Sequence, residues 1–387
     1  MFYTLTEQEI RQGKVTDIYF VRTKEILDAL KIKRRVAAEV FTKKLPKNWE
    51  WAVFCGLEEV LDLLSTHDVV VRSLPEGSVF YPGQPVLEIE GEYTDFGLHE
   101  TAILGFLCQA TGIATMAARC RVAAGNRPLL SFGARRMHPA IAPMIDRAAY
   151  IGGCDGVSSV ASAELLDLPP TGTMPHALIL LVGDTVDTAK SFNEVIDKAV
   201  NRIVLIDTFQ DEKFEAVRVA EALGKDLAGV RLDTPGSRRG NFKEILAEVR
   251  WELNMRGYSH VKLLASGGLD EYSIKDLNPL CDSYGVGTSI SSAITVDFSF
   301  DIVDIEGTPV AKRGKKSGRK DLYRCDGCAE HIVVPRGEKP KCECSGKPVP
   351  LLKEYRPKDA MKNYPKAGEI RKFVLEQLEA FGEGDIK

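Results

Sequence analysis

The sequence predicts an α/β protein that combines an irregular α/β barrel, an N-terminal α+β domain and a small C-terminal domain resembling a zinc knuckle. Three observations support this: short apolar runs that end in Asp, Gly, Ser or Thr, amphipathic stretches between them, and four closely spaced cysteines near the C-terminus. Strands that alternate with helices pair in parallel and present their chemistry at their carboxyl ends. A doubly wound open sheet is the competing topology.

The chain is long enough for three expected domains, 1–125, 126–300 and 301–387. The first combines helical periodicity over 23–43, 50–65 and about 96–124 with short strands between Pro-Gly turns. In the barrel domain the expected strands are 129–133, 150–154, 171–174, 203–207, 229–232, 261–265 and 283–287. The helices expected between them are 157–166, 188–200, 212–224 and 241–256.

Composition limits the class of protein. With 51 Lys and Arg against 55 Asp and Glu, the net charge is −4, which is not the basic footprint of a nucleic-acid-binding protein. The first residues are too polar for a signal peptide, and we expect no run that spans a bilayer. We therefore expect a soluble, cytoplasmic protein that binds neither nucleic acid nor membrane. The basic run 309–324 is expected to be a solvated linker, or alternatively a flexible lid over phosphates.

Four cysteines form two close pairs, Cys325-x-x-Cys328 and Cys342-x-Cys344. Two such pairs fit four thiolates around one tetrahedral Zn²⁺, and a full thiolate set makes the metal structural. Disulfides are the weaker alternative in an intracellular protein, and His331 is an alternative ligand. The other five cysteines lie in apolar surroundings and are expected to be buried thiols.

Glycine-rich tips follow the last two expected strands, at Ser266-Gly267-Gly268 and at Gly285-Val-Gly287-Thr288-Ser. Free N–H groups at adjacent tips form an anion nest, so these residues are predicted to bind phosphate, with ordinary βα turns as the alternative. Gly236 opens a third such loop, Gly-Ser-Arg-Arg-Gly, whose two cations also suit phosphate oxygens.

Two strands end in a carboxylate, at Asp207 and Asp233. Such a carboxylate can accept hydrogen bonds from a ribose diol or bind Mg²⁺ through water, and the alternative role is a helix N-cap. Arg231 precedes Asp233 by two residues and should lie on the same face of its strand.

Upstream, His176 lies in a Gly/Pro-rich loop, where a structural role is the alternative to a functional one. Phe132 is followed by Arg135 and Arg136. An aromatic face beside guanidinium groups can hold a planar aromatic acid. Core packing of the ring and salt bridges at a helix start are the alternatives.

Taken in order, these motifs resemble the nicotinate phosphoribosyltransferase family over residues 16 to about 290. The motifs are Thr16-Asp17-Ile-Tyr19, Phe132-Gly-x-Arg135-Arg136, Gly156-Val-Ser158, Thr173-x-x-His176, Asp207-Thr-Phe, Arg231-Leu-Asp233, Ser266-Gly-Gly and Gly285-Val-Gly-Thr288-Ser. The resemblance implies an irregular barrel beside an α+β domain. It also implies a homodimer with shared active sites, and it leaves a higher oligomer of dimers open.

The resemblance also implies roles for individual residues. Tyr19 of the partner subunit and Phe132 would enclose the pyridine ring, and Thr173 and Arg231 would contact nicotinate. Asp207 and Asp233 would hold the ribose or its Mg²⁺, the two last tips would hold the 5-phosphate, and ATP would phosphorylate His176.

Substrate choice depends on Ser158, where nicotinamide-using relatives carry an Asp. Because a serine can donate to a carboxylate, nicotinate is favoured over nicotinamide. We therefore expect an ATP-coupled nicotinate phosphoribosyltransferase of NAD salvage, which joins nicotinate and phosphoribosyl pyrophosphate into nicotinate mononucleotide and pyrophosphate. One alternative is a quinolinate or nicotinamide phosphoribosyltransferase. The alternative of another class is a zinc-containing nucleic-acid-binding or scaffold protein.

Overall fold

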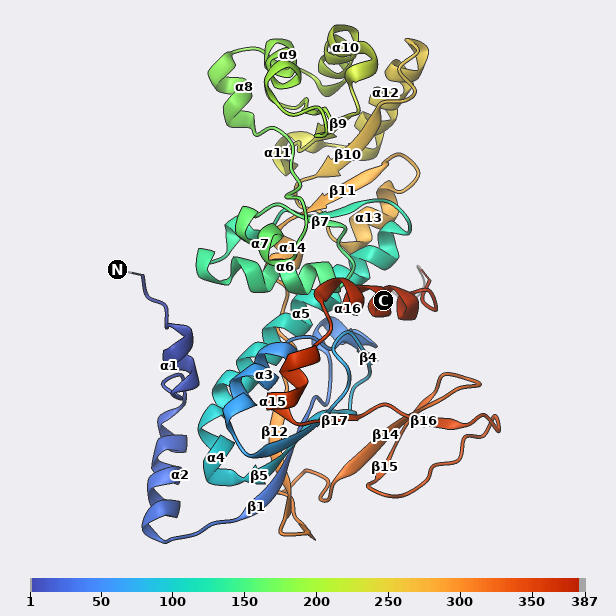
Figure 1. The fold of residues 1–387 in the computed structure, drawn as a ribbon. Helices are drawn as coiled ribbons and strands as arrows, with labels where there is room; N and C mark the ends of the chain where they lie inside the picture. The colour runs from blue at the N-terminus through green and yellow to red at the C-terminus, as the bar shows by residue number, and fades with distance from the viewer. Residues whose placement is uncertain (1, 383–387) are drawn as a thin grey trace. The chain divides into compact units, whose positions relative to one another are not determined.

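The computed structural model describes residues 2–382 and divides the chain into two compact units (Figure 1). Among the described residues, unit 1 contains 2–115 and 294–377, and unit 2 contains 116–293 and 378–382. The chain is of the mixed α/β kind, as predicted. Residues 301–377, which the sequence analysis treats as a third domain, are grouped with unit 1.

Unit 1 is built on a six-stranded antiparallel sheet in the order β13-β12-β1-β5-β3-β17. Its strands are β1 (Arg35–Phe41), β3 (Val69–Ser73), β5 (Pro85–Glu92), β12 (Ser299–Ile305), β13 (Thr308–Pro309) and β17 (Lys353–Tyr355). The ends of the chain therefore meet in one sheet, and the expectation of an N-terminal α+β domain is confirmed.

Smaller elements complete unit 1. The pair β2 (Ala52–Val53) and β4 (Val79–Phe80) forms a ribbon, and a three-stranded sheet consists of β14 (Lys320–Cys325), β15 (His331–Pro335) and β16 (Pro348–Pro350). The helices are α1 (Glu7–Arg11), α2 (Ile18–Ala29), α3 (Leu57–Leu63), α4 (Tyr93–Phe96), α15 (Pro357–Ala360) and α16 (Ala367–Leu378). Helix α5 (Glu100–Ala124) begins in unit 1 and continues into unit 2 from residue 116.

The expected helix over 23–43 is wrong in its second half. Helix α2 ends at Ala29, and Lys31 has a positive φ of 55°, which breaks the helical path. Residues 35–41 then form β1, which lies between two other strands and is buried on both faces. An apolar run of this kind cannot be assigned to strand or helix by periodicity alone.

The segment Tyr93–Ala124 contains the long helix α5 and is long and apolar enough to cross a bilayer. The sequence-based expectation that no apolar run is long enough to span a bilayer is therefore wrong for this segment. However, 67% of its most apolar window is buried inside the protein. This is the environment of a core helix in a soluble protein, in which Ile103, Leu107 and Ile113 are fully buried.

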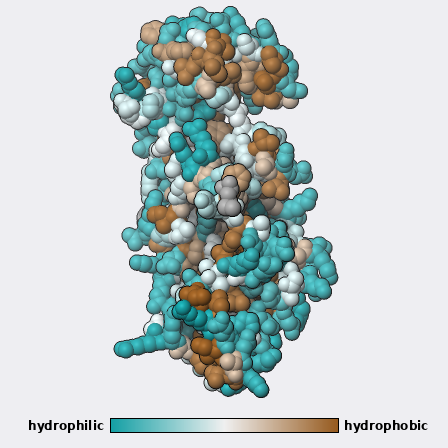
Figure 2. Space-filling model, turned by 90° about the vertical axis from the view of Figure 1, so that its left-hand side faces the viewer, coloured by the Kyte–Doolittle hydropathy of each residue, from teal (hydrophilic) through white to brown (hydrophobic). Residues whose placement is uncertain are grey.

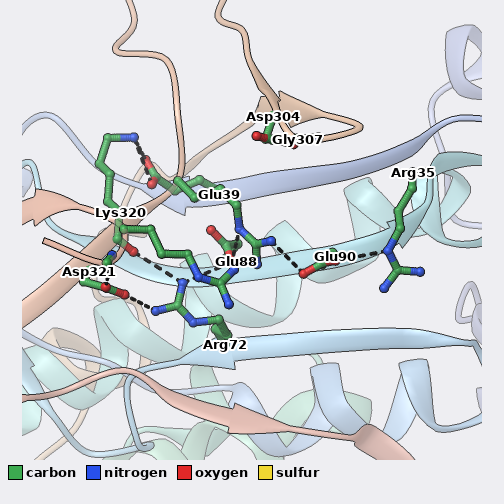
Figure 3. A network of polar contacts seen from close by, with 12 residues as sticks. Arg35, Glu39, Arg72, Glu88, Glu90, Asp304, Gly307, Lys320 and Asp321 are labelled. Atoms are coloured by element: carbon green, nitrogen blue, oxygen red, sulfur yellow. Dashed lines mark hydrogen bonds and ion pairs between the residues drawn. The ribbon is translucent and has the colours of Figure 1, made fainter.

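The basic run 309–324 is neither a solvated linker nor a lid, because its cations bind carboxylates of the unit 1 sheet (Figure 3). Arg319 contacts Glu88 at 2.5 Å and Glu90 at 2.7 Å. Lys320 at the start of β14 contacts Glu39 at 3.0 Å. These ion pairs fasten the cysteine-bearing ribbon to the sheet.

Unit 2 contains a six-stranded parallel sheet in the order β7-β6-β11-β10-β9-β8. Its strands are β6 (Leu129–Ser131), β7 (Gly156–Val157), β8 (Ile203–Leu205), β9 (Gly229–Leu232), β10 (Lys262–Ser266) and β11 (Ser283–Val286). Strands β7 and β8 form open edges. The predicted barrel is therefore only a half-barrel.

Helices connect these strands, as the parallel pairing requires. They are α6 (Ala142–Ile151), α7 (Val160–Leu165), α8 (His176–Val182), α9 (Thr185–Val195), α10 (Glu212–Leu223), α11 (Gly236–Arg239), α12 (Phe242–Met255), α13 (Glu271–Leu277) and α14 (Thr288–Ser291).

Two expected strands of the barrel are wrong. Residues 150 and 151 end α6, whose helical spacing buries Ile145, Ala148, Ala149 and Ile151. Residues 171–174 form an extended segment outside the sheet. The preceding Pro169 and Pro170 lack the N–H groups that a sheet needs, and the apolar run after His176 is the helix α8.

Candidate active site

The carboxyl ends of the parallel strands surround one cavity of about 560 Å³ in unit 2. The register places the tips next to each other, since Ser266 on β10 pairs with Gly285 on β11, and Leu264 pairs with Arg231 on β9. Most of the residues predicted to bind substrate line this cavity, namely Phe132, Arg135, Arg136, Ser158, Thr173, Arg231, Asp233, Ser266, Gly267, Gly268, Gly287 and Thr288.

Arg231 is the centre of a hydrogen-bond network in the cavity. Its Nε donates to Ser266 Oγ at 2.9 Å, its Nη1 to Thr173 Oγ1 at 3.0 Å and its Nη2 to Asp233 Oδ2 at 3.0 Å. The guanidinium carbon lies 5.2 Å from the centre of the Phe132 ring. Burial lowers the pKa of Arg231, and Asp233 and Asp207 oppose this shift. The side chain stays a cation in any case, because arginine titrates far above neutral pH.

Phe132 is positioned by a glycine opposite to it. A Cβ on Gly285 would lie 2.4 Å from the Phe132 ring, so only glycine leaves room for the ring. Arg135 and Arg136 lie in a short 3₁₀ turn just after this ring. The cavity is therefore lined by one aromatic ring and by three arginines, Arg135, Arg136 and Arg231.

His176 and Asp207 form a pair beside the cavity. His176 Nε2 lies 3.2 Å from Asp207 Oδ2, and the side chain of Asp207 is only 2% exposed. Burial raises the pKa of Asp207, while the contact with His176 opposes the shift. Neither residue is among those that line the cavity, although the preceding Pro175 is. The carboxylate thus fixes the orientation of an imidazole that is 41% exposed.

Some residues that the sequence predicts for the site are not among those that line the cavity. Gly236 is exposed at the start of α11 and does not line it. Tyr19 belongs to unit 1, where it is 56% exposed on α2 and its hydroxyl donates to Asp17 Oδ2 at 3.2 Å. Arg238, one of the two loop cations, is exposed, whereas Arg239 is half-buried and binds backbone carbonyls.

Three residues that line the cavity were not predicted from the sequence as site residues: Gly172, Met174 and Pro175. They flank Thr173 in the loop before α8. Glycine and proline in such a loop are equally typical of an ordinary turn, so the sequence could not show that this segment faces the cavity.

The four predicted zinc ligands come together in unit 1. The thiol groups of Cys325, Cys328, Cys342 and Cys344 all lie within 4.8 Å of one another. Gly346 has no Cβ, and one would lie 2.5 Å from Cys325 Sγ. The close cluster and the tetrathiolate donor set fit Zn²⁺. His331 is not part of the cluster, since its Nδ1 lies 3.2 Å from Gln84 Oε1.

Comparisons with known proteins identify two matching family models. Residues 17–111 match the model of the quinolinate phosphoribosyl transferase N-terminal domain, and residues 113–301 match that of its C-terminal domain. A crystal structure of a nicotinate-nucleotide pyrophosphorylase from Pyrococcus furiosus is 56% identical, with a TM-score of 0.95 and 98% coverage of both chains.

More distant relatives are named differently. Nicotinate phosphoribosyltransferase pncB1 of Mycobacterium tuberculosis is 31% identical over 353 residues, which cover 79% of this chain and 77% of the relative. The structure of human nicotinic acid phosphoribosyltransferase shares the fold, with a TM-score of 0.71 at 20% identity, and covers 96% of this chain and 95% of its own.

These findings overturn the expectation of an ATP-coupled nicotinate phosphoribosyltransferase. Both family models are of the quinolinate type, and the 56% identical structure is a nicotinate-nucleotide pyrophosphorylase, so a ligase that hydrolyses ATP through phosphorylated His176 is wrong. The prediction failed because the serine at position 158 favours a carboxylate over a carboxamide but cannot show whether the ring carries one carboxylate or two. A ring with two carboxylates satisfies the same motif.

Proposed function

Because the chain belongs to the quinolinate phosphoribosyl transferase family of NAD biosynthesis, we propose that it transfers the phosphoribosyl group to quinolinate and decarboxylates the product without ATP. The observation that carries this proposal is that three arginines, Arg135, Arg136 and Arg231, line the same cavity as the aromatic ring of Phe132. Quinolinate has one more carboxylate than nicotinate and needs this larger number of cations. The 56% identity with the pyrophosphorylase supports the same substrate.

In the proposed reaction the pyridine nitrogen attacks C1 of phosphoribosyl pyrophosphate, and the C1–O bond to pyrophosphate breaks. The resulting mononucleotide loses the carboxylate at C2 as carbon dioxide. The electron pair of that bond stays on C2 beside the cationic nitrogen and takes up a proton, which gives nicotinate mononucleotide. Transfer at C1 passes through an oxocarbenium-like state, so positioning and electrostatic stabilisation supply most of the catalysis.

The residues of the cavity have distinct roles in this proposal. Phe132 packs on the ring, and Arg135, Arg136 and Arg231 bind its carboxylates, while Ser158 and Thr173 donate hydrogen bonds. Asp233 accepts from the ribose hydroxyls. His176, oriented by Asp207, donates to the departing pyrophosphate.

The tips at Ser266, Gly267, Gly268, Gly287 and Thr288 hold the 5-phosphate through backbone N–H groups. Mg²⁺, held through phosphate oxygens near Asp233, would neutralise charge on the diphosphate. We place this reaction in the cytoplasm.

We also propose a homodimer in which the partner's Tyr19 closes the ring site. Apolar residues near Tyr19 support this, because Ile18, Ile26 and Leu30 on or next to α2 are exposed. In unit 2, Leu180, Leu181 and Val182 of α8 are also exposed, and Figure 2 shows apolar side chains gathered at the surface in this region. Exposed apolar patches of this kind mark association surfaces.

A mixing experiment tests the shared site. Tyr19→Ala and Asp233→Ala should each be inactive as pure dimers. Co-expressed with different tags and purified as mixed dimers, they should recover about a quarter to a half of the activity per chain, because one site receives neither substitution. Mixed dimers as inactive as their parents would exclude shared sites.

We further propose that one Zn²⁺ is bound by the cysteine cluster in a structural role.

The substrate itself is tested by steady-state assays with quinolinate, nicotinate and nicotinamide, each with phosphoribosyl pyrophosphate and Mg²⁺ and without ATP. We expect turnover with quinolinate only. Product from nicotinate at a higher kcat/KM than from quinolinate would overturn the proposal.

A further inference from the structure

Arg239 lies behind the glycine tip that is proposed to hold the 5-phosphate, and does not line the cavity itself. Its Nε donates to Thr234 O at 3.0 Å, and its Nη2 donates to Ser266 O at 2.9 Å and to Gly267 O at 2.6 Å. The guanidinium carbon also lies 4.2 Å from the centre of the buried Phe242 ring. The side chain is thus held between an aromatic face and three carbonyl oxygens.

These contacts determine where the backbone N–H groups of the tip point. In a trans peptide the carbonyl of one residue and the N–H of the next are directed to opposite sides. The carbonyls of Ser266 and Gly267 point to Arg239, so the N–H groups of Gly267 and Gly268 point away from it. Both glycines line the cavity, and neither N–H donates in the turn and loop hydrogen bonds of residues 2–382.

The backbone angles agree with this arrangement. Gly267 and Gly268 have φ values of 80° and 65°, a conformation that side-chain-bearing residues rarely adopt. A Cβ on Gly267 would lie 2.8 Å from Asp233 Oδ1 and 3.0 Å from Arg239 Nη2. Consecutive N–H groups directed to one side form a nest for an anion. The nest exists only while the two carbonyls stay turned outward.

We infer that Arg239 is a positioning residue for the phosphomonoester of the substrate. It does not contact the phosphate, but it binds the carbonyls of Ser266 and Gly267 and so directs the N–H groups of Gly267 and Gly268 toward the phosphate. This rests on the proposed function, in which the tip holds the 5-phosphate. Arg239 also adds a positive charge behind the nest. The adjacent Arg238 is exposed and makes none of these contacts, so it serves as a matched control.

Binding of ribose 5-phosphate, measured by titration calorimetry, tests this without turnover. Arg239→Gln should raise the Kd about tenfold, the size expected for lost hydrogen bonds to a charged group, while Arg238→Gln should change it less than about twofold. Methylguanidine should restore binding to Arg239→Ala. Equal Kd values for the Arg239→Gln and Arg238→Gln variants would overturn the inference.

Kinetics separates positioning from general damage to the fold. In Arg239→Gln the KM for phosphoribosyl pyrophosphate should rise about tenfold, with the KM for quinolinate unchanged within about twofold. If this variant does not fold, Arg239→Lys provides the same comparison, since lysine keeps the positive charge but lacks the planar set of N–H donors that binds several carbonyls at once. Equal rises in both KM values would contradict positioning. If the enzyme turns over nicotinate instead of quinolinate, but Arg239→Gln still binds ribose 5-phosphate more weakly than Arg238→Gln, the proposed function is wrong and this inference stands.

Discussion

Arg231 in unit 2 and Arg319 in unit 1 are exposed to nearly the same extent, 17% and 18%, yet their surroundings differ. Arg231 binds two hydroxyls and one carboxylate, and it lines a cavity. Arg319 binds two carboxylates, Glu88 and Glu90. The number of carboxylates around an arginine, more than its exposed fraction, therefore decides whether its charge is available to a ligand.

The acidic side of the unit 1 network shows the same contrast. Glu88 is 3% exposed and contacts Arg72, Arg319 and Arg336. Figure 3 shows Arg72 beside Glu88. Asp233 in unit 2 contacts Arg231 and Ser266 and is open to the cavity. The charges of this unit 1 network therefore hold strands together, whereas Arg231 and Asp233 in unit 2 face a cavity.

The largest effect is expected from replacing the arginine of the cavity. Arg231→Met should lower kcat/KM about 10³-fold, because it removes a cation from the carboxylates and releases Ser266 and Thr173. Arg319→Met should change kcat/KM less than about twofold. Steady-state kinetics on both variants checks this, and equal losses would mean that the two arginines do not differ as described.

The next effect concerns stability. Glu88→Gln should lower the free energy of unfolding by about 3 kcal/mol, since it removes the carboxylate that Arg72 and Arg319 share and leaves each with one carboxylate partner, Asp321 and Glu90 respectively. Glu306→Gln removes the exposed pair with Arg34 and should cost less than about 1 kcal/mol. Denaturant unfolding measures both. A loss in Glu88→Gln no greater than that in Glu306→Gln would contradict a structural role of the network.

Removal of the proposed zinc should destabilise unit 1 without affecting the cavity chemistry. We expect about one Zn²⁺ per chain by mass spectrometry, and its loss in Cys328→Ser together with a drop of about 2 kcal/mol in stability. Cys108→Ser, outside the cluster, should keep the metal. Protein that folds without any bound metal would refute the site.

A smaller effect is expected from pH. Burial lowers the pKa of His99 to about 4, and the neighbouring His67 adds to the shift. The folded protein therefore holds His99 neutral while the unfolded chain takes up a proton below about pH 6.5. Stability from this group is complete above pH 6.5 and is lost as pH falls toward 4, by about 2 kcal/mol at pH 4.5.

The variant His99→Gln should make the unfolding free energy less dependent on pH between 6.5 and 4.5. Thermal unfolding at a series of pH values measures this. A pH profile identical to that of the wild type would show that His99 is not the group that titrates.

Local sequence was enough to predict the tips of β9, β10 and β11, because a strand followed by glycine or aspartate is a short-range pattern. Local sequence was not enough at the end of α6, because a short apolar run there is equally compatible with a strand and with a buried helix. The partners of the basic segment were also hidden, since Arg319 and Glu88 are 231 positions apart. The wrong choice of an ATP-coupled nicotinate enzyme has another cause. Arg135, Arg136 and Arg231 were all predicted from the sequence, but only the fold shows that all three line one cavity.

The central claim, that the cavity of unit 2 carries out decarboxylating phosphoribosyl transfer, is tested most directly by the stoichiometry of one turnover. Quinolinate labelled at its C2 carboxylate is incubated with phosphoribosyl pyrophosphate and Mg²⁺, and labelled carbon dioxide and pyrophosphate are counted. We predict one carbon dioxide per pyrophosphate, with no requirement for ATP and none consumed when it is added. Pyrophosphate formed without carbon dioxide, or only when ATP is hydrolysed, would contradict the claim.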